Sequence, residues 1–375
     1  MLNQIRKQLQ NKLIRETSWS FATKGVSVIF FFLLNFYLAN VLGPEQFGVW
    51  SFFFSIFTMI LLFSNFGVST SSGKFVAEHV GTPQLNNILK NAFSLRLLVS
   101  SLFSIGTFLI SVPLANWLGR PHFAYYLQLA APLILFSGYI VFLKAIFIGL
   151  HRIKYNFIVN ILEFGLKFLF AFLVLFVSLD LANIVNAFTL AAFLTIVVGL
   201  YLLYTNFYDS ENLQQGVDFT KAIFQYAIPL MFVRVGFLVV TEVDTFMLGV
   251  LSTDTEVGVY SVAKQLVTKL PQISYAIAMG SMPIFAKLNE ENKAKLTKLF
   301  VRLLKINGLI FGIIAVVLLT LSWFFVPLLF PAYGDAVLPL QILTVYIVAF
   351  SFSVLLNNFL DFRGLAKKRA IHLWI

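Results

Sequence analysis

Eleven charged side chains lie inside long apolar runs of the sequence, where a charge is unfavourable unless it has a structural or functional role. A charge at the centre of a membrane-spanning helix costs about 2.5–3.5 kcal/mol on insertion scales, so such groups should face protein or water. The eight cations outnumber the three acids by five, and a wet cavity with that excess would suit a phosphate or diphosphate group. The cations are Lys24, Arg96, Lys144, Lys167, Arg234, Lys264, Lys269 and Lys305. The acids are Glu163, Glu242 and Asp244.

Some of these charges also have a purely structural explanation. Arg96 and Lys305 lie within about one turn of an expected cytoplasmic boundary, where long side chains extend toward water. Lys269 precedes Pro271 and can bond carbonyls that the proline leaves without a helical donor. The sequence offers no local partner for Lys24, Lys144, Arg234 and Lys264.

The three acids each leave two interpretations open. Glu163 and Lys167 are four residues apart with the acid first, which favours an ion pair on one helix face over two functional groups. Glu242 and Asp244 lie about 200° apart on a helix, so only one of them can face a given cavity. A buried carboxylate beside a cation is a candidate for ion or proton coupling, and a static pair with Arg234 or Lys264 is the alternative. Arg234 and Thr241, seven residues apart, should share a face.

Composition identifies the elements that must hold these groups. Of the 375 residues, 59% are hydrophobic and 11% are charged, against about 45–50% and about 25% in globular proteins. A soluble domain could not bury that much apolar surface, so we expect an all-α, polytopic membrane protein. The absence of cysteine excludes disulfides and thiolate sites, and four scattered histidines form no cluster, so we expect no metal, cofactor or catalytic residue.

Ten apolar runs are long enough to cross a bilayer core of about 30 Å, which needs about 20 helical residues. The runs are 18–40, 48–72, 93–117, 123–148, 157–179, 183–206, 223–250, 258–284, 304–329 and 337–361. If the N-terminus is cytoplasmic, the cytoplasmic segments hold 18 of the 27 lysines and arginines, and the outer loops hold only Arg120. This bias predicts a cytoplasmic N-terminus and explains the net charge of +11 without nucleic-acid binding.

An internal repeat divides the chain. Gly48-Val49-Trp50-Ser51 matches Gly258-Val259-Tyr260-Ser261 at an offset of 210 residues, and six runs precede residue 210. We therefore predict a six-helix bundle at 1–206, a polar cytoplasmic linker at 207–222 and a second bundle at 223–375. Related bundles are typical of transporters, whose substrate site lies where the bundles meet.

The second bundle is incomplete by this register. A basic turn at 149–154 follows the fourth run, and a similar turn at 364–369 follows the tenth. Two further runs should come after it, so we expect the chain to be truncated after the tenth helix, with a natural ten-helix protein as the alternative.

Several motifs bear a family resemblance. These are Leu42–Gly48, Asn65–Val68, Asp244 followed by Met247–Gly249, and Val257–Lys264. The chain resembles bacterial polysaccharide flippases of the O-antigen, Wzx type, within the multidrug/oligosaccharidyl-lipid/polysaccharide (MOP) exporter superfamily, whose fold is like that of MATE transporters.

That resemblance implies movement of undecaprenyl-diphosphate-linked oligosaccharide units, for lipopolysaccharide O-antigen or another surface polysaccharide, across the bacterial inner membrane. It implies alternating access coupled to H+ or Na+, contact with membrane lipid, and the polysaccharide polymerase machinery as a further partner. The first, second, seventh and eighth spans line the cavity in that family, which favours Lys24, Arg234, Asp244 and Lys264 over Lys144 and Lys167. The polar residues expected to meet sugar hydroxyls are Asn35, Asn65, Thr70 and Gln265.

Two other functions are alternatives. A multidrug or cation antiporter of the same superfamily should have an acid-rich cavity, whereas cations are in excess here. A membrane polysaccharide polymerase or ligase should carry a sizeable outer loop with reacting groups, whereas the outer connections are only a few residues long and contain no hydrolase or metalloprotease motif. We therefore expect a transporter rather than an enzyme.

Overall fold

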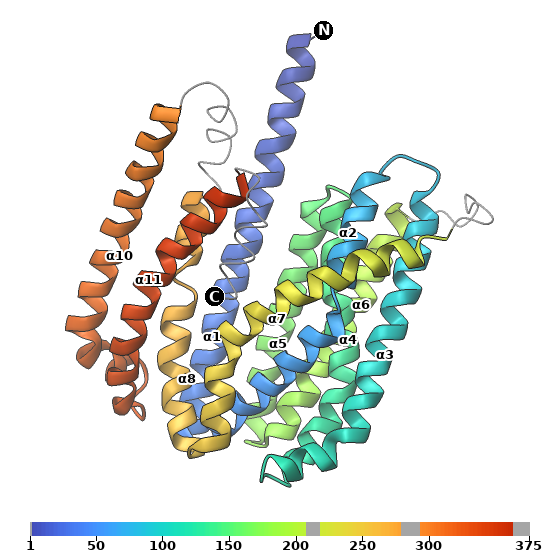
Figure 1. Ribbon diagram of the computed structural model, residues 1–375. Helices are drawn as coiled ribbons and strands as arrows, with labels where there is room; N and C mark the ends of the chain where they lie inside the picture. Colours follow the sequence, from blue (N-terminus) through green and yellow to red (C-terminus); the bar gives the residue numbers. More distant parts are fainter. Residues whose placement is uncertain (1, 208–217, 279–292, 363–375) are drawn as a thin grey trace. The chain divides into compact units, whose positions relative to one another are not determined.

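The computed structural model describes residues 2–207, 218–278 and 293–362, and these residues form helices with no strand among them (Figure 1). The prediction of an all-α, polytopic membrane protein is confirmed. The basic turn at 364–369 and most of the predicted linker at 207–222 lie outside the described residues. The helices are α1 (Leu2–Asn65), α2 (Val68–Glu78), α3 (Leu85–Trp117), α4 (Phe123–Gly149), α5 (Ile153–Val177), α6 (Leu181–Phe207), α7 (Thr220–Leu251), α8 (Asp254–Thr268), α10 (Lys293–Leu329) and α11 (Val337–Phe362).

Seven described helices are long and apolar enough to cross a membrane, or eight if the bent α7 counts as one span. These eight helices correspond to nine of the ten predicted runs, because α1 contains the first run and most of the second. The apolar part of α1, Ser18–Asn65, has 48 residues, a length of about 72 Å, more than twice a bilayer core. The remaining run, at 258–284, corresponds in its described residues to the 15-residue α8 and to a second helical stretch at 272–278.

Two sharp breaks divide the first helices. Within α1, Gly43 has φ 73° and ψ 173°, and Pro44 begins the next helical segment, where its missing N–H costs nothing. Between α1 and α2, Phe66 and Gly67 have φ values of 44° and 73°. The predicted run at 48–72 is therefore two helices that meet at Phe66–Gly67.

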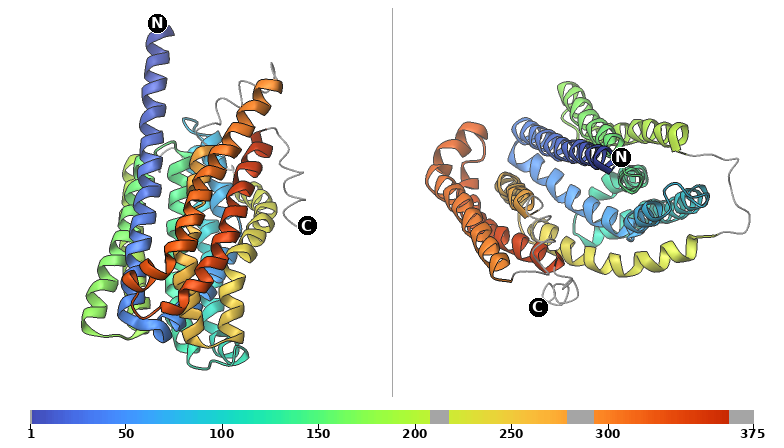
Figure 2. Two further views of the ribbon diagram at one scale, coloured as in Figure 1. Left: turned by 90° about the vertical axis from the view of Figure 1, so that its left-hand side faces the viewer. Right: turned by 90° about the horizontal axis from the view of Figure 1, so that it is seen from above.

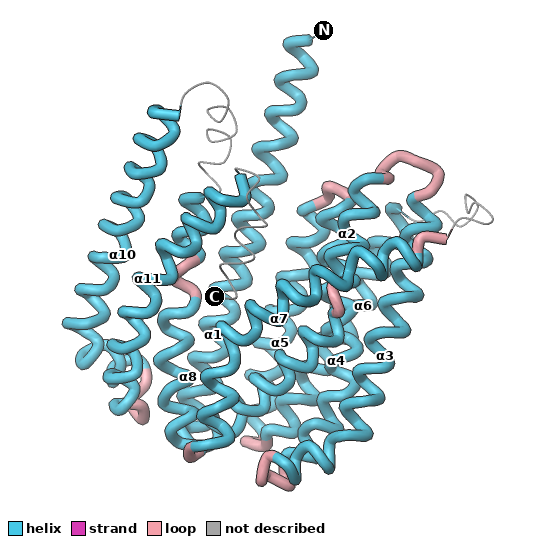
Figure 3. The backbone as a smooth tube through the Cα atoms, viewed as in Figure 1, coloured by secondary structure: helices cyan, strands magenta, loops and turns pink. Residues whose placement is uncertain are grey.

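The chain forms two compact units. The first contains residues 1–37 and 52–251, and the second contains 38–51 and 252–375. In the first unit, α4 packs against α2, α3, α5 and α6, and short loops join α3 through α6 (Figure 3). The contacts group α7 with the N-terminal helices, and α7 runs obliquely across α2 (Figure 2). The two units are defined by contacts, whereas the predicted bundle boundaries at 206 and 223 are defined by the sequence repeat. Those boundaries therefore stay predictions.

In the second unit, the two copies of the repeated motif touch each other. A Cβ on Gly48 would lie 2.9 Å from the Gly258 nitrogen, and a Cβ on Gly258 would lie 3.1 Å from the Gly48 nitrogen. Each would also collide with a backbone carbonyl, that of Asp254 for Gly48 and that of Pro44 for Gly258. The 210-residue offset exchanges these two contacts, so the motif packs against its own repeat.

Candidate functional site

A polar stripe runs along one face of the otherwise apolar α5. Asn156, Asn160, Glu163 and Lys167 are separated by four, three and four residues, which places them on one helix face. All four side chains are buried in the first unit. Polar side chains at this depth need partners, and neighbouring helices supply them.

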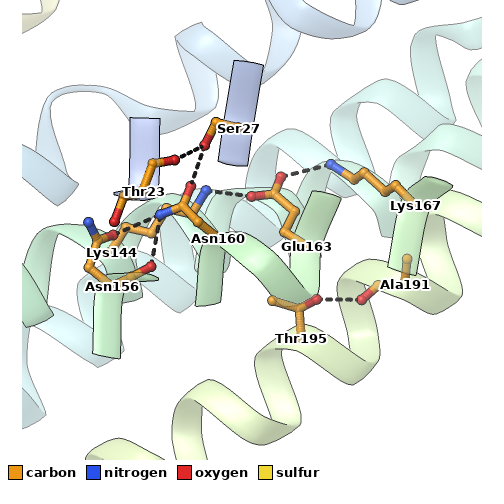
Figure 4. Close-up of polar contacts among 9 residues, drawn as sticks. All are labelled: Thr23, Ser27, Lys144, Asn156, Asn160, Glu163, Lys167, Ala191 and Thr195. Carbon is orange, nitrogen blue, oxygen red and sulfur yellow. Dashed lines mark hydrogen bonds and ion pairs between the residues drawn. The ribbon is translucent and has the colours of Figure 1, made fainter. Parts of the chain in front are cut away.

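Glu163 lies between two lysines (Figure 4). Its Oε2 accepts a hydrogen bond from Lys144 Nζ of α4 at 2.5 Å, and its Oε1 accepts one from Lys167 Nζ at 2.8 Å. The side chains are 21% exposed for Lys144 and 11% exposed for the other two. Two cations around one acid give this cluster one net positive charge, so it suits an anion.

Aromatic rings border the same cluster. The Lys144 ammonium lies 5.3 Å from the centre of the Phe164 ring, and the Lys167 ammonium lies 5.7 Å from that of Phe188. Ring faces attract cations, and apolar walls strengthen the charge–charge interactions among the three groups. The carboxylate and the rings therefore hold both ammonium groups in place.

Neutral polar groups connect the cluster's helix to α1. Ser27 Oγ lies 3.4 Å from Asn160 Oδ1 and 2.8 Å from the Thr23 carbonyl oxygen. Asn160 Nδ2 donates to Asn156 Oδ1 at 3.0 Å. These amides and hydroxyls were not among the predicted site residues, although the spacing along α5 was a usable signal. Such groups can exchange hydrogen bonds with water or with sugar hydroxyls.

The structure gives one lysine of this cluster a partner from another helix and confirms one predicted ion pair. Lys144, for which the sequence offered no partner, pairs with Glu163 on the neighbouring helix. The predicted pair between Glu163 and Lys167 is confirmed. Together they form a bridged triad rather than one neutral pair, so the excess charge expected at depth is present locally.

Arg234 lies where α7 meets α2. Its Nη2 donates to Thr70 Oγ1 at 2.8 Å, which joins two residues predicted to contact substrate. The helix is bent by 56° between Thr220–Gly236 and Thr241–Leu251. The prediction that Arg234 and Thr241 share one face assumed a straight helix, and across this bend it stays a prediction.

The other predicted site residues lie apart from the triad in the chain. Lys24 is exposed on α1, and Lys264 is half-buried on α8, in the second unit. Glu242 and Asp244 are half-buried beyond the α7 bend, and Asp244 Oδ1 accepts a hydrogen bond from the Thr245 amide at 2.7 Å. A cavity shared by these groups stays a prediction.

Arg96 was expected to extend toward water, and that prediction is wrong. Its side chain is fully buried, and its Nη1 donates to the Ser64 carbonyl oxygen at 2.8 Å. Ser64 lies in the last turn of α1, where carbonyls lack helical donors and no water can replace them in a membrane. Gly138 leaves room for the guanidinium, because a Cβ there would lie 3.1 Å from Arg96 Cζ.

Comparisons with known proteins agree with this architecture. The profile of a family described as polysaccharide biosynthesis protein matches residues 13–289. An uncharacterized membrane protein of Methanocaldococcus jannaschii is 22% identical over 279 residues, which cover 72% of this chain and 65% of that protein.

Solved structures of MATE transporters share the fold. An inward-facing multidrug resistance MATE family transporter of the MOP superfamily gives a TM-score of 0.76 at 15% identity, over 94% of this chain and 86% of the other. A MATE protein in the straight conformation gives 0.67 at 16% identity, over 96% and 84%. The chain is therefore a multi-pass membrane protein that belongs to the polysaccharide biosynthesis protein family and has the fold of MOP-superfamily transporters.

Proposed function

We propose that the protein moves undecaprenyl-diphosphate-linked oligosaccharide units from the cytoplasmic to the periplasmic leaflet of a bacterial inner membrane. The N-terminus is cytoplasmic in this proposal, and transport proceeds by ion-coupled alternating access. The observation that carries it is the triad of Lys144, Glu163 and Lys167, whose side chains are at most 21% exposed and whose net positive charge fits a diphosphate. Membership of a polysaccharide biosynthesis family supports a glycan as the cargo.

Each part of the substrate has a chemical counterpart in this proposal. The two lysines hold the diphosphate, and the amides of Asn156 and Asn160 with the hydroxyl of Ser27 meet sugar hydroxyls. The prenyl chain stays in lipid, where it needs no polar partner. Arg234 and Lys264 add positive charge along the route, and Glu242 or Asp244 binds the coupling ion.

The test is export of surface glycan in a bacterium that lacks its own flippase. The charge reversal Lys144→Glu with Lys167→Glu should abolish export, because the triad then holds three acids and repels a diphosphate. Lys154→Glu is the matched control, since Lys154 is exposed on the same helix and should retain export. Normal export by the double variant at wild-type protein level would contradict the proposal, as would efflux of cationic dyes in place of glycan export.

A further inference from the structure

Glu163 occupies the donors that a bound phosphate needs. Each lysine ammonium has three N–H donors, and within the described part of the chain both Lys144 and Lys167 donate one hydrogen bond to Glu163. The carboxylate therefore stands between the two cations in the absence of substrate, as an anion that the protein itself supplies. Lys144 is the most exposed of the three.

Charge balance limits how a diphosphate can bind here. A diphosphate that joins a prenyl chain to a sugar carries two negative charges around neutral pH. Added to a triad of net charge +1, it would leave one unbalanced negative charge at a site whose side chains are 11–21% exposed, and burying such a charge is costly. One proton on Glu163 brings the sum to zero and gives the carboxyl an O–H that can donate to a phosphate oxygen.

We propose that Glu163 is an exchangeable counter-anion for the substrate. Phosphate oxygens replace its carboxylate on Lys144 and Lys167, and one proton passes from water to a Glu163 carboxyl oxygen as the substrate binds. The proton returns to water when the substrate leaves. This inference rests on the proposed function, and it makes proton binding and substrate binding strengthen each other equally.

The surroundings assign that proton to Glu163. Lys144 from α4 and Lys167 from α5 are its two charged neighbours. From α1 the neutral hydroxyl of Ser27 reaches the α5 stripe, whereas the Lys24 side chain is exposed. Helix α6 contains no Asp, Glu, Lys, Arg or His. Glu16 of α1 accepts a hydrogen bond from the Ile153 amide at the start of α5, whereas Glu163 is the described carboxylate that contacts both lysines. A proton taken up near neutral pH on binding is therefore assigned to Glu163.

Calorimetry on the protein in lipid nanodiscs tests the inference directly. Farnesyl-diphosphate-N-acetylglucosamine is titrated in two buffers of equal pH and different ionisation enthalpy, which gives the number of protons taken up per ligand. We expect about one proton per ligand and a Kd that tightens by up to about tenfold for each pH unit lowered. Binding without proton uptake in the wild-type protein would overturn the inference.

Variants separate an exchangeable carboxylate from a merely structural one. Glu163→Gln should bind the ligand at least as tightly as wild type at neutral pH, without proton uptake, because the competing anion is gone. Weaker binding by this variant would contradict the inference. Glu78→Gln, in an exposed pair with Lys74 at the same four-residue spacing, is the matched control and should behave as wild type.

A second variant serves if Glu163→Gln does not fold. Lys144→Met combined with Glu163→Gln keeps one net positive charge but only one of the two lysines, so it should bind more weakly than wild type and without proton uptake, whereas uptake equal to wild type would contradict the inference. The two proposals fail differently. If wild type binds the ligand without proton uptake, and the double variant Lys144→Met with Lys167→Met does not bind it, the inference is overturned and the proposed function stands. No binding by wild type overturns both.

Discussion

Adding a methyl group to either glycine of the repeated motif should force two helical segments of the second unit apart. A Cβ at Gly48 would lie 2.9 Å from the Gly258 nitrogen and closer still to the Asp254 carbonyl, and both are backbone atoms that cannot rotate away. Ordinary contact needs about 3.4 Å or more, so relieving the Gly258 contact alone requires a separation of about 0.5 Å, and relieving the closer Asp254 contact requires more than about 1 Å. Overpacking of this kind costs about 1–3 kcal/mol. We expect Gly48→Ala and Gly258→Ala to lose similar amounts of stability, because each reports on the same approach.

Thermal unfolding in detergent measures this effect. Gly312→Ala is the matched control, because Gly312 is helical in the same unit and has nothing within 4 Å of its Cβ position. It should be neutral or gain up to about 1 kcal/mol from the better helix former. The double alanine variant should cost less than the sum of the single variants, since one separation relieves both contacts. Gly48→Ala as stable as Gly312→Ala would refute the reasoning.

Two further predictions concern the ends of helices in the first unit. Arg96→Ala should lower stability by about 2–5 kcal/mol in thermal unfolding, because it leaves a cavity and an unpaired Ser64 carbonyl; an unchanged melting temperature would contradict this. The Thr220 amide donates to Asp218 Oδ1 at 2.8 Å and holds the pKa of that carboxyl below its ordinary value. The bond therefore stabilises the start of α7 above that ordinary pKa and is lost as pH falls through the lowered one. Hydrogen exchange of the Thr220 amide, corrected for its intrinsic rate, should accelerate in strong acid in the wild-type protein. In Asp218→Asn, which has no carboxyl to protonate, the corrected rate should not change with pH.

The positions of the helices followed from the sequence because the membrane imposes a simple requirement. Runs of about 20 apolar residues must be helical in lipid, and the predicted runs at 123–148 and 183–206 agree closely with α4 and α6. The breaks were harder to predict. Gly43-Pro44 is a recognisable helix stop and start, whereas Phe66 at positive φ depends on the packing of α7 against Gly67 and Phe66.

The candidate site could be predicted only where its partners share a helix. The four-residue spacing gave the Glu163–Lys167 pair, but Lys144 comes from another helix, and no local pattern brings it to Glu163. Arg96 shows the same limit more strongly. Its partner is a backbone carbonyl freed by a helix end, so its burial could not be foreseen without knowing where α1 stops.

Flipping of a lipid-linked glycan by the purified protein tests the central claim most directly. The protein is placed in liposomes with a fluorescent undecaprenyl-diphosphate oligosaccharide, and an impermeant reductant quenches the label in the outer leaflet alone. We expect wild type and Lys154→Met to expose the inner-leaflet label to quenching, and Lys144→Met with Lys167→Met to leave about half of it protected, as in protein-free liposomes. Equal exposure by the double variant, or none by wild type, would contradict the account.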